Sequence, residues 1–435
     1  MRVFRVLIMA AALAAVASPA RSMDACAQAG HCQRFDDGDT LALDASLRLR
    51  GLYYDPARFG IGGSEDGYGL LRALASVDWR HDRWQAYLQL GVHAEQGRDG
   101  GPGGTDQGAL DAQQASLAWQ GDHARWQLGR QEISYGSARL LSVRDGPNIR
   151  LAFDGLRAAW HDDHARVDAL LLRPVDNRPG AFDDRSDDGQ FLAGVYATFA
   201  PLSARPLKFD AYALRYGRDD AQFGSARGDE LRTSLGTRLF GQRGGWDWNN
   251  EFVYQTGSLA DPAGRLEIRA WTIATDTGYR WPQLRWQPRL GMKIDLISGD
   301  GDAHDARLQT FNALYPKAAY FSEASLLAPA NLVDVQPSVT WQPLPDFTVL
   351  LGAQLAWKQR RADAIYVTPT PLTPLPGSVG TARRIGTQYK LETSWQASAH
   401  WQWQWQLAWI DAGDGLRQAG GRDTAFASIV ASWQW

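Results

Sequence analysis

Tryptophan or leucine stands at every second position of WQWQWQLAW, residues 401–409, and glutamine fills most of the positions between. Successive side chains of a β-strand point to opposite faces of the sheet, so this segment predicts a strand with one apolar face and one amide-bearing face. The same alternation recurs at residues 41–54, 84–92 and 289–297. No segment after residue 40 keeps the period of an amphipathic helix. We therefore expect an all-β protein.

The connections between the predicted strands alternate in length. Short links such as residues 81–82 and 343–345 take turns with long ones such as residues 133–152, 298–330 and 360–381, which are rich in Gly, Asp and Pro. A soluble β-sandwich would show the same alternation within its strands. An even number of strands, with short turns at one end and long loops at the other, is typical of transmembrane barrels. We predict a transmembrane antiparallel β-barrel of about 18 strands, with short periplasmic turns and long extracellular loops. The predicted strands lie near residues 41–54, 68–80, 83–95, 109–119, 123–132, 153–161, 165–174, 188–200, 207–217, 230–240, 246–256, 267–281, 284–297, 331–342, 346–359, 382–396, 400–411 and 423–435.

Aromatic residues lie beside the predicted short turns, as Trp79 and Trp84 do on either side of residues 81–82. This placement indicates an aromatic girdle at a membrane interface. The alternative is that they cap a soluble core, but 19 tryptophans would be many for one core. The chain ends in ASIVASWQW, with alternate apolar residues before Trp435. This ending resembles the terminal signal of bacterial outer-membrane barrels, so we expect contact with outer-membrane lipid and with the barrel assembly machinery.

The N-terminal segment predicts export. Residues 1–20 combine Arg2 and Arg5 with an apolar run too short to span a bilayer and a small-residue ending, as in a secretory signal peptide cleaved near Ala20, with Ala17 as the second choice. Residues 21–40 are expected to form a short periplasmic segment before a barrel of residues 41–435. Its two cysteines, Cys26 and Cys32, favour a disulfide over a metal site, because no Cys or His cluster accompanies the pair. Lipid anchoring at Cys26 is a minor alternative.

The alternation also predicts which side chains face the lumen. An eighteen-stranded barrel is wide enough for an aqueous channel, so the inward residues form the functional surface. Cations with few acidic neighbours would attract anions there, whereas neutralised ion pairs would form a solvated wall. The predicted pore-lining cations on the strands include Arg48, Arg50, Arg72, Arg157 and Lys293, and the acidic or amide residues include Asp44, Asp295, Glu251, Gln402 and Gln404.

Two long stretches carry motifs that together are specific. The first, residues 129–160, contains GRQ, SYG, SVRDGPN and FDG; the second, residues 299–339, contains FNALYPK and ANL. Together they resemble the alginate export family of outer-membrane porins. The resemblance implies a monomeric eighteen-stranded barrel, with an arginine-lined constriction that passes an anionic polyuronate and is partly gated by loops. It also implies pore-lining roles for the arginines of the first stretch, namely Arg130, Arg144, Arg150 and Arg157.

The expected function is an outer-membrane channel for an anionic saccharide, such as an alginate-like polyuronate or an acidic oligosaccharide. A guanidinium fits a carboxylate bidentately, and several in series would pass a uronate chain from site to site. Uptake of small organic solutes is the alternative, since the chain carries a net charge of −3, which becomes −5 without the two arginines of residues 1–20. A third possibility is a receptor-like barrel plugged by its own long loops.

Other functional classes have little support in the sequence. The eight histidines are scattered and no Ser, His and acid spacing stands out, so we expect neither an enzyme nor a cofactor. The net acidic charge does not favour nucleic acid as a partner. His161 and His164 of HDDH are best interpreted as part of a solvated periplasmic turn. In GDGDAHD, Asp300, Asp302 and Asp305 are a weak calcium candidate, for which a metal-free polar loop is the preferred interpretation.

Overall fold

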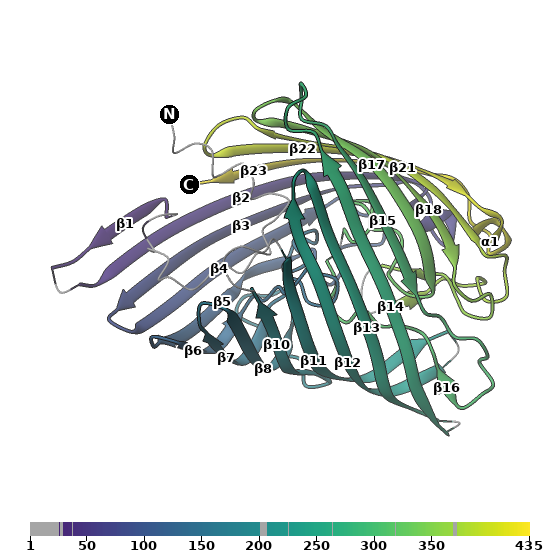
Figure 1. The fold of residues 1–435 in the computed structure, drawn as a ribbon, viewed down its shortest axis with the longest axis horizontal. Helices are drawn as coiled ribbons and strands as arrows, with labels where there is room; N and C mark the ends of the chain where they lie inside the picture. The colour runs from purple at the N-terminus through teal and green to yellow at the C-terminus, as the bar shows by residue number, and fades with distance from the viewer. Residues whose placement is uncertain are drawn as a thin grey trace.

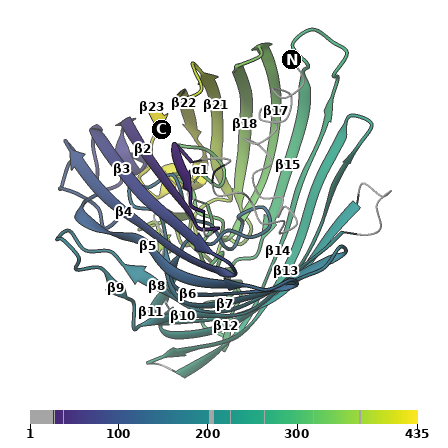
Figure 2. The ribbon, with the colours of Figure 1, turned by 90° about the vertical axis from the view of Figure 1, so that its left-hand side faces the viewer.

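One antiparallel sheet closes on itself into a barrel (Figures 1 and 2). The computed structural model describes residue 26 and residues 29–36 and 38–435, apart from 201–206, 225, 263, 318 and 369–371. Closure occurs between β2 (Thr40–Asp55) and β23 (Thr424–Gln434), since β2 pairs with β23 along one edge and with β3 (Asp66–His81) along the other. The prediction of an all-β barrel of about 18 strands is confirmed.

Eighteen strands form the wall within the described part of the chain. After β2 and β3 they are β4 (Trp84–Gln96), β5 (Gly108–Gln120), β6 (Ala124–Gln131), β7 (Phe153–His161), β8 (Ala165–Asp176), β10 (Gln190–Phe199), β11 (Leu207–Phe223), β12 (Ala226–Arg243), β13 (Trp246–Asp261), β14 (Gly264–Arg280), β15 (Arg289–Ile297), β17 (Leu332–Leu344), β18 (Phe347–Lys358), β21 (Arg384–Gln396), β22 (Trp401–Ala412) and β23. The shorter elements are β1 (His31–Arg34), η2 (Ala57–Gly60), β9 (Arg185–Ser186), β16 (Arg307–Leu308), β19 (Tyr366–Val367), β20 (Thr373–Pro374) and α1 (Asp414–Gln418).

The predicted strand positions agree with these bounds except at two places. Strands β11 to β14 continue past their predicted ends. β11 ends at Phe223 and β12 begins at Ala226, and β13 ends at Asp261 and β14 begins at Gly264, where the alternation in loop length predicted longer loops. Strand β15 begins at Arg289 rather than at residue 284. The preceding residues form a turn in which Trp286 and Gln287 have positive φ and Trp281 N donates to the Pro288 carbonyl, so they cannot join the strand.

Alternation along the strands separates an apolar outer face from the lumen. Leu49, Leu128 and Leu407 are 46 %, 63 % and 52 % exposed, although they are among the most hydrophobic residues. Exposure of this kind on every strand is expected only where the solvent is hydrocarbon. On β22 the outward side chains include Trp401, Leu407 and Trp409, as the sequence predicted.

The lumen contains a hydrophobic cluster of its own near the ends of the strands that carry the long loops. Inward strand residues such as Leu52 and Leu70 pack with Leu140, Phe311 and Tyr315 from two loops, residues 132–152 and 298–331. Figure 2 shows loop segments inside the ring of strands. These loops therefore fold into the barrel, and the inward face of the strands turns apolar where they pack.

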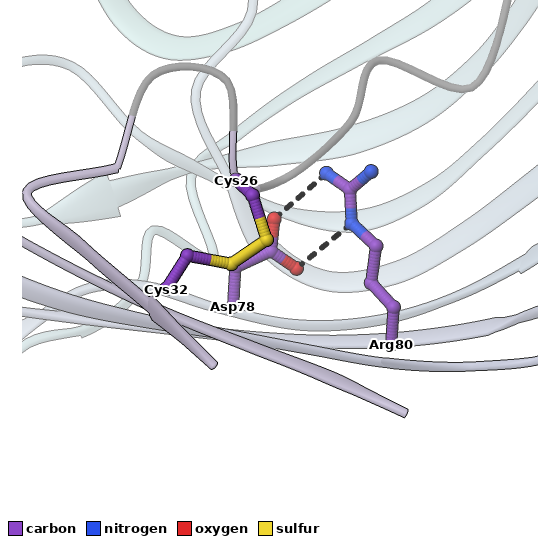
Figure 3. The surroundings of a disulfide bond; sticks show 4 residues. All are labelled: Cys26, Cys32, Asp78 and Arg80. Atoms are coloured by element: carbon purple, nitrogen blue, oxygen red, sulfur yellow. Dashed lines mark hydrogen bonds and ion pairs between the residues drawn. A yellow bond between two sulfur atoms is a disulfide. The ribbon is translucent and has the colours of Figure 1, made fainter. Parts of the chain in front are cut away.

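The N-terminal segment lies against the first barrel strand at the end with the short turns. Strand β1 pairs with the start of β2, Cys32 opposite Ala42, and a disulfide joins Cys26 to Cys32. Figure 3 shows this disulfide together with the ion pair of Asp78 and Arg80 on β3, whose atoms Oδ2 and Nη2 are 2.8 Å apart. Within the described residues, no helix is long and apolar enough to cross a bilayer.

Candidate functional site: the lumen and its loops

Two neighbouring strands hold a loop inside the barrel. Arg48 of β2 and Arg72 of β3 are direct cross-strand partners on the lumen face. Two like charges in this arrangement repel each other. The carboxylate of Asp145 lies between them, with Oδ1 2.6 Å from Arg72 Nη1 and Oδ2 3.7 Å from Arg48 Nη1. The loop segment 142–149 therefore supplies the counter-charge that the two strands lack.

The same guanidinium groups also bind the backbone of this segment. Arg72 Nε donates to the Asn148 carbonyl at 2.8 Å, and one Nη nitrogen of each of Arg48 and Arg72 donates to the Pro147 carbonyl at 2.8 Å. Arg50 Nη1 donates to the Gly146 carbonyl at 2.8 Å. All three arginines are at least nine-tenths buried. Predicted as pore-lining cations, they do lie on the lumen face, but their donors are occupied by the loop.

The other part of this loop is bound to the opposite wall. Ser137 Oγ donates to Glu251 Oε2 at 2.9 Å, and Arg139 Nη1 lies 3.0 Å from the same oxygen. Glu251 belongs to β13, the eleventh of the eighteen strands counted from β2, so it stands almost diametrically across from Arg48 and Arg72. The loop of residues 132–152, named the cross-lumen loop below, thus spans the barrel.

A second loop, residues 298–331, joins the cross-lumen loop. Leu141 and Tyr315 form an isolated parallel bridge, and Lys317 N donates to the Ala138 carbonyl at 2.9 Å. This loop is bound to the wall as well, because Lys390 Nζ of β21 donates to the Phe321 carbonyl at 2.7 Å. The two stretches that carry the most specific motifs are therefore in contact with each other within the lumen.

Arg144 of the cross-lumen loop and Lys317 of the second loop have no ion-pair partner among the described residues. Neither charged group makes a hydrogen bond to the part of the chain that the structure describes, and Arg144 Nε is fully buried. Arg144 has a left-handed backbone, with φ 53°, a conformation that costs free energy for a residue other than glycine. Burial lowers the pKa of Arg144 to about 10, so the side chain stays charged at neutral pH.

Lys317 lies in a cationic cluster. Burial, followed by the positive charges of Lys293 and Arg139, lowers the pKa of Lys317 to about 7. Lys390 adds a further positive charge, and Asp276 is the acidic group that partly offsets them. The Lys293 Nζ is 3.7 Å from Asp276 Oδ2. Proximity of several cations leaves a local excess of positive charge beside the second loop.

Other lumen cations are paired with carboxylates. Arg157 Nε is 2.7 Å from Asp168 Oδ1, and Arg150 Nε is 2.9 Å from Glu132 Oε1. Burial alone would raise the pKa of Asp145, but the guanidinium groups of Arg72 and Arg48 lower it to about 2, so this loop carboxylate is ionised at every physiological pH.

The position of Arg130 differs from the sequence prediction that it lines the pore. On β6 it shares its strand face with Leu128, which is 63 % exposed on the outer wall, and it pairs across the strands with Asp154. Arg130 Nε lies 2.9 Å from Asp154 Oδ1, and Nη1 lies 3.6 Å from Asp111 Oδ1. Its predicted pore-lining role is wrong, since alternation from Leu128 turns its side chain away from the lumen.

The predicted acidic and amide residues Asp44, Asp295, Glu251, Gln402 and Gln404 all lie on the lumen face by alternation. Asp295 is buried, with its backbone N 3.3 Å from Oδ1 of Asp334 on the adjacent strand β17. Gln402 Nε2 donates to Ser394 Oγ at 3.3 Å. The sequence reasoning did not single out Asp145, Lys317 or Lys390, although the motifs SVRDGPN and FNALYPK contain the first two.

Carboxylate clusters in the described residues do not single out a metal centre. Only Asp111, Asp183 and Asp184 bring three ligand atoms close together there, and the guanidinium of Arg130 already supplies positive charge beside two of them. Asp300, Asp302 and Asp305 do not converge as a three-carboxylate group. Instead, Asp302 and Asp305 accept hydrogen bonds from backbone N–H groups two residues ahead, as in a metal-free polar turn.

A closed eighteen-stranded barrel with an apolar outer face and charged loops in its lumen is the architecture of an outer-membrane channel. Solved structures share this fold at 10–11 % sequence identity. OccK1 (OpdK) of Pseudomonas aeruginosa matches with a TM-score of 0.59 over 90 % of this chain and 98 % of its own. A BenF-like porin of Pseudomonas fluorescens Pf-5 gives 0.59 with the same coverage, and OccAB1 of Acinetobacter baumannii gives 0.59 over 91 % and 96 %.

The sequence carries a more specific match than the fold. Residues 39–429 match the family described as alginate export, so the chain belongs to that family. None of the curated proteins matches the sequence. The chain is thus an outer-membrane channel protein of the bacterial cell, as predicted from its strand pattern and motifs.

Proposed function

We propose that the channel passes anionic saccharides, such as a polyuronate or an acidic oligosaccharide, across the outer membrane. The observation that carries this proposal is that each of the two lumen loops presents a cation without an acidic partner, Arg144 on one and Lys317 on the other. An arginine or lysine that has no carboxylate partner in the protein can bind a carboxylate of the transported saccharide, whereas an arginine already paired with a carboxylate cannot. Membership of the alginate export family supports the same cargo class.

Uptake of small organic solutes is the second candidate, favoured by the many neutralised pairs in the lumen. Arg48 and Arg72 share Asp145, and Arg157 is paired with Asp168. Such a wall would be suited to small solutes of either charge sign. Under this alternative the channel would conduct ions with little preference for anions and would not be blocked by uronate chains.

Ion selectivity in planar bilayers separates the two functions. We expect the reversal potential across a KCl gradient to show anion preference, and added uronate oligosaccharide to block the current. Replacing both free cations, in Arg144→Ala with Lys317→Ala, should reduce the anion-to-cation permeability ratio at least about threefold, because the local positive potential is lost. Uronate block should weaken in parallel.

Arg130→Gln is the matched control, since it removes one arginine from the outer wall, close in sequence to the cross-lumen loop that carries Arg144. It should leave selectivity and block unchanged. A wild-type channel that prefers neither ion and is not blocked by uronates would overturn the proposal in favour of small-solute uptake. Absence of any conductance from a folded barrel would overturn both.

A further inference from the structure

The outer wall of the barrel has an apolar groove of about 900 Å³. It extends across six neighbouring strands, from Trp246 at the start of β13 to Tyr389 on β21. Its lining side chains point outward, as the 51 % exposure of Leu290 and the 53 % exposure of Leu351 show. The groove begins at the short-turn end of the barrel, where Trp246 and Trp281 flank two turns. It therefore faces the periplasmic half of the bilayer.

A row of small residues lies beneath the groove. Gly278 of β14 pairs with Gly291 of β15, which pairs with Ser338 of β17, which pairs with Gly352 of β18. Alternation turns these four positions toward the lumen, so only their backbone faces the groove. A Cβ at Gly278 would lie 2.2 Å from Arg289 Cζ, so the Arg289 side chain occupies the space directly against the backbone.

Arg289 is fixed in this position by a neighbouring carboxylate. Its Nε donates to Asp247 Oδ2 at 2.8 Å, and an Nη nitrogen lies 3.4 Å from Asp276 Oδ1. The floor of the groove is thus bare backbone on the lipid side and a bound guanidinium on the lumen side.

Hydrocarbon is the only filling that suits the walls. If the groove were empty, its lining would lose dispersion contacts. If it were filled with water, about thirty molecules, at roughly 30 Å³ each, would lie against apolar side chains. The lining is almost entirely apolar, with Leu290, Met292, Leu351 and Tyr389 among its members. An acyl chain satisfies both conditions.

A cation lies in a turn next to the groove. Arg285 lies in the turn between β14 and β15, whose flanking residues Trp281 and Leu290 line the groove. Its guanidinium is exposed, lies 5.0 Å from the Trp286 ring centre, and has no acidic partner among the described residues. Guanidinium groups bind phosphate well. We propose that the groove is a binding site for a phospholipid of the periplasmic leaflet, with its acyl chains against the glycine row and its phosphate at Arg285.

Native mass spectrometry of the folded protein tests this site. The channel is exchanged from phosphatidylglycerol into mild detergent, and retained lipid is counted. We expect one lipid to remain on the wild type and at least a tenfold smaller retained fraction in Ala353→Trp, whose indole would fill the groove opposite Tyr389. Arg285→Gln should weaken retention and abolish any preference for phosphatidylglycerol over phosphatidylcholine.

Two variants serve as matched controls. Ala169→Trp places the same bulk on the exposed outer face of β8, away from the groove. Arg83→Gln removes an arginine that lies 5.9 Å from the Trp119 ring in another short turn. Both should retain lipid as the wild type does. If Ala353→Trp fails to fold, Met292→Trp replaces it.

Three results would overturn the proposal. The first is equal lipid retention by the wild type and the folded groove variants. The second is an equal loss of lipid in Ala169→Trp and Ala353→Trp, since it would show that the lipid binds non-specifically around the whole barrel. The third is a dimeric mass that Ala353→Trp converts to monomer, because a second copy of the chain would then occupy the groove.

Discussion

Single side chains in the lumen differ in function according to whether a carboxylate neutralises them. Arg48 and Arg72 face inward, yet Asp145 and four loop carbonyls, including that of Asp145, use their charge and donors. Lys317 has no such partner, and its environment depresses its basicity. A lumen rich in arginine therefore has many neutralised cations, whereas Arg144 and Lys317, which have no acidic partner among the described residues, lie on loops.

Lys317 predicts a pH dependence of selectivity. Since the pKa of Lys317 is lowered to about 7, its ammonium is present below that pH and lost above it. Anion selectivity should therefore fall between about pH 6 and pH 8, as reversal potentials would record. The slope should vanish in Lys317→Met, and Lys317→Arg should keep selectivity high at pH 8. An unchanged slope in Lys317→Met would assign the titration to another group.

The sequence predicts the orientation of a side chain where the period-two alternation of a strand determines it. The lumen positions of Arg48, Glu251 and Lys293 follow from alternation with the outward Leu49, Phe252 and Met292 next to them in the strand. Arg130 was assigned through the family resemblance, although Leu128, two residues earlier, indicated the outer face. The pairing of Arg72 with Asp145 was beyond prediction, because the two residues are 73 positions apart and are joined by a loop with no regular period.

At the scale of elements, strands and loops were predictable to different degrees. Period-two alternation located all eighteen strands, because hydrocarbon on one side and water on the other impose it on each of them. Loop length did not reveal that residues 132–152 fold inward, nor that β11 to β14 extend into long hairpins. The apolar side chains of Leu140 and Leu141 were the available signal, since an exposed loop would not carry them adjacent to each other.

The cross-lumen loop should detach at one end when its anchors are removed. In Arg72→Ala, the Asn148 carbonyl loses its donor, at a cost of about 1–3 kcal/mol for a buried group left unpaired, and the carbonyls of Asp145 and Pro147 keep only their hydrogen bonds from Arg48. Hydrogen exchange at residues 142–149 should become faster, and single-channel conductance should rise or fluctuate more. Arg173→Ala, at an exposed pair with Asp188, is the control and should change neither. Faster exchange throughout the wall strands would instead indicate a general loss of stability.

For the whole molecule, the two faces of the wall predict opposite tolerances to charge. Leu407 and Gln404 lie three residues apart on β22, one toward lipid and one toward the lumen. Leu407→Arg should lower the free energy of unfolding by about 2–4 kcal/mol, since it places a charge in hydrocarbon. Gln404→Arg should change it by less than about 1 kcal/mol. Urea titration of the protein folded into vesicles would measure both, and equal costs would contradict the face assignment.

The cross-lumen loop has a mechanical consequence. A closed sheet of eighteen strands is a thin-walled tube, and lateral pressure from the bilayer could flatten it into an ellipse. The loop is hydrogen-bonded to β2 and β3 at one side and to β13 almost directly across, so it acts as a tie between opposite walls. Stretching the tube along that diameter would have to break these bonds, and compressing it would have to crush the packed loop. The segment that narrows the passage thus also keeps the tube round.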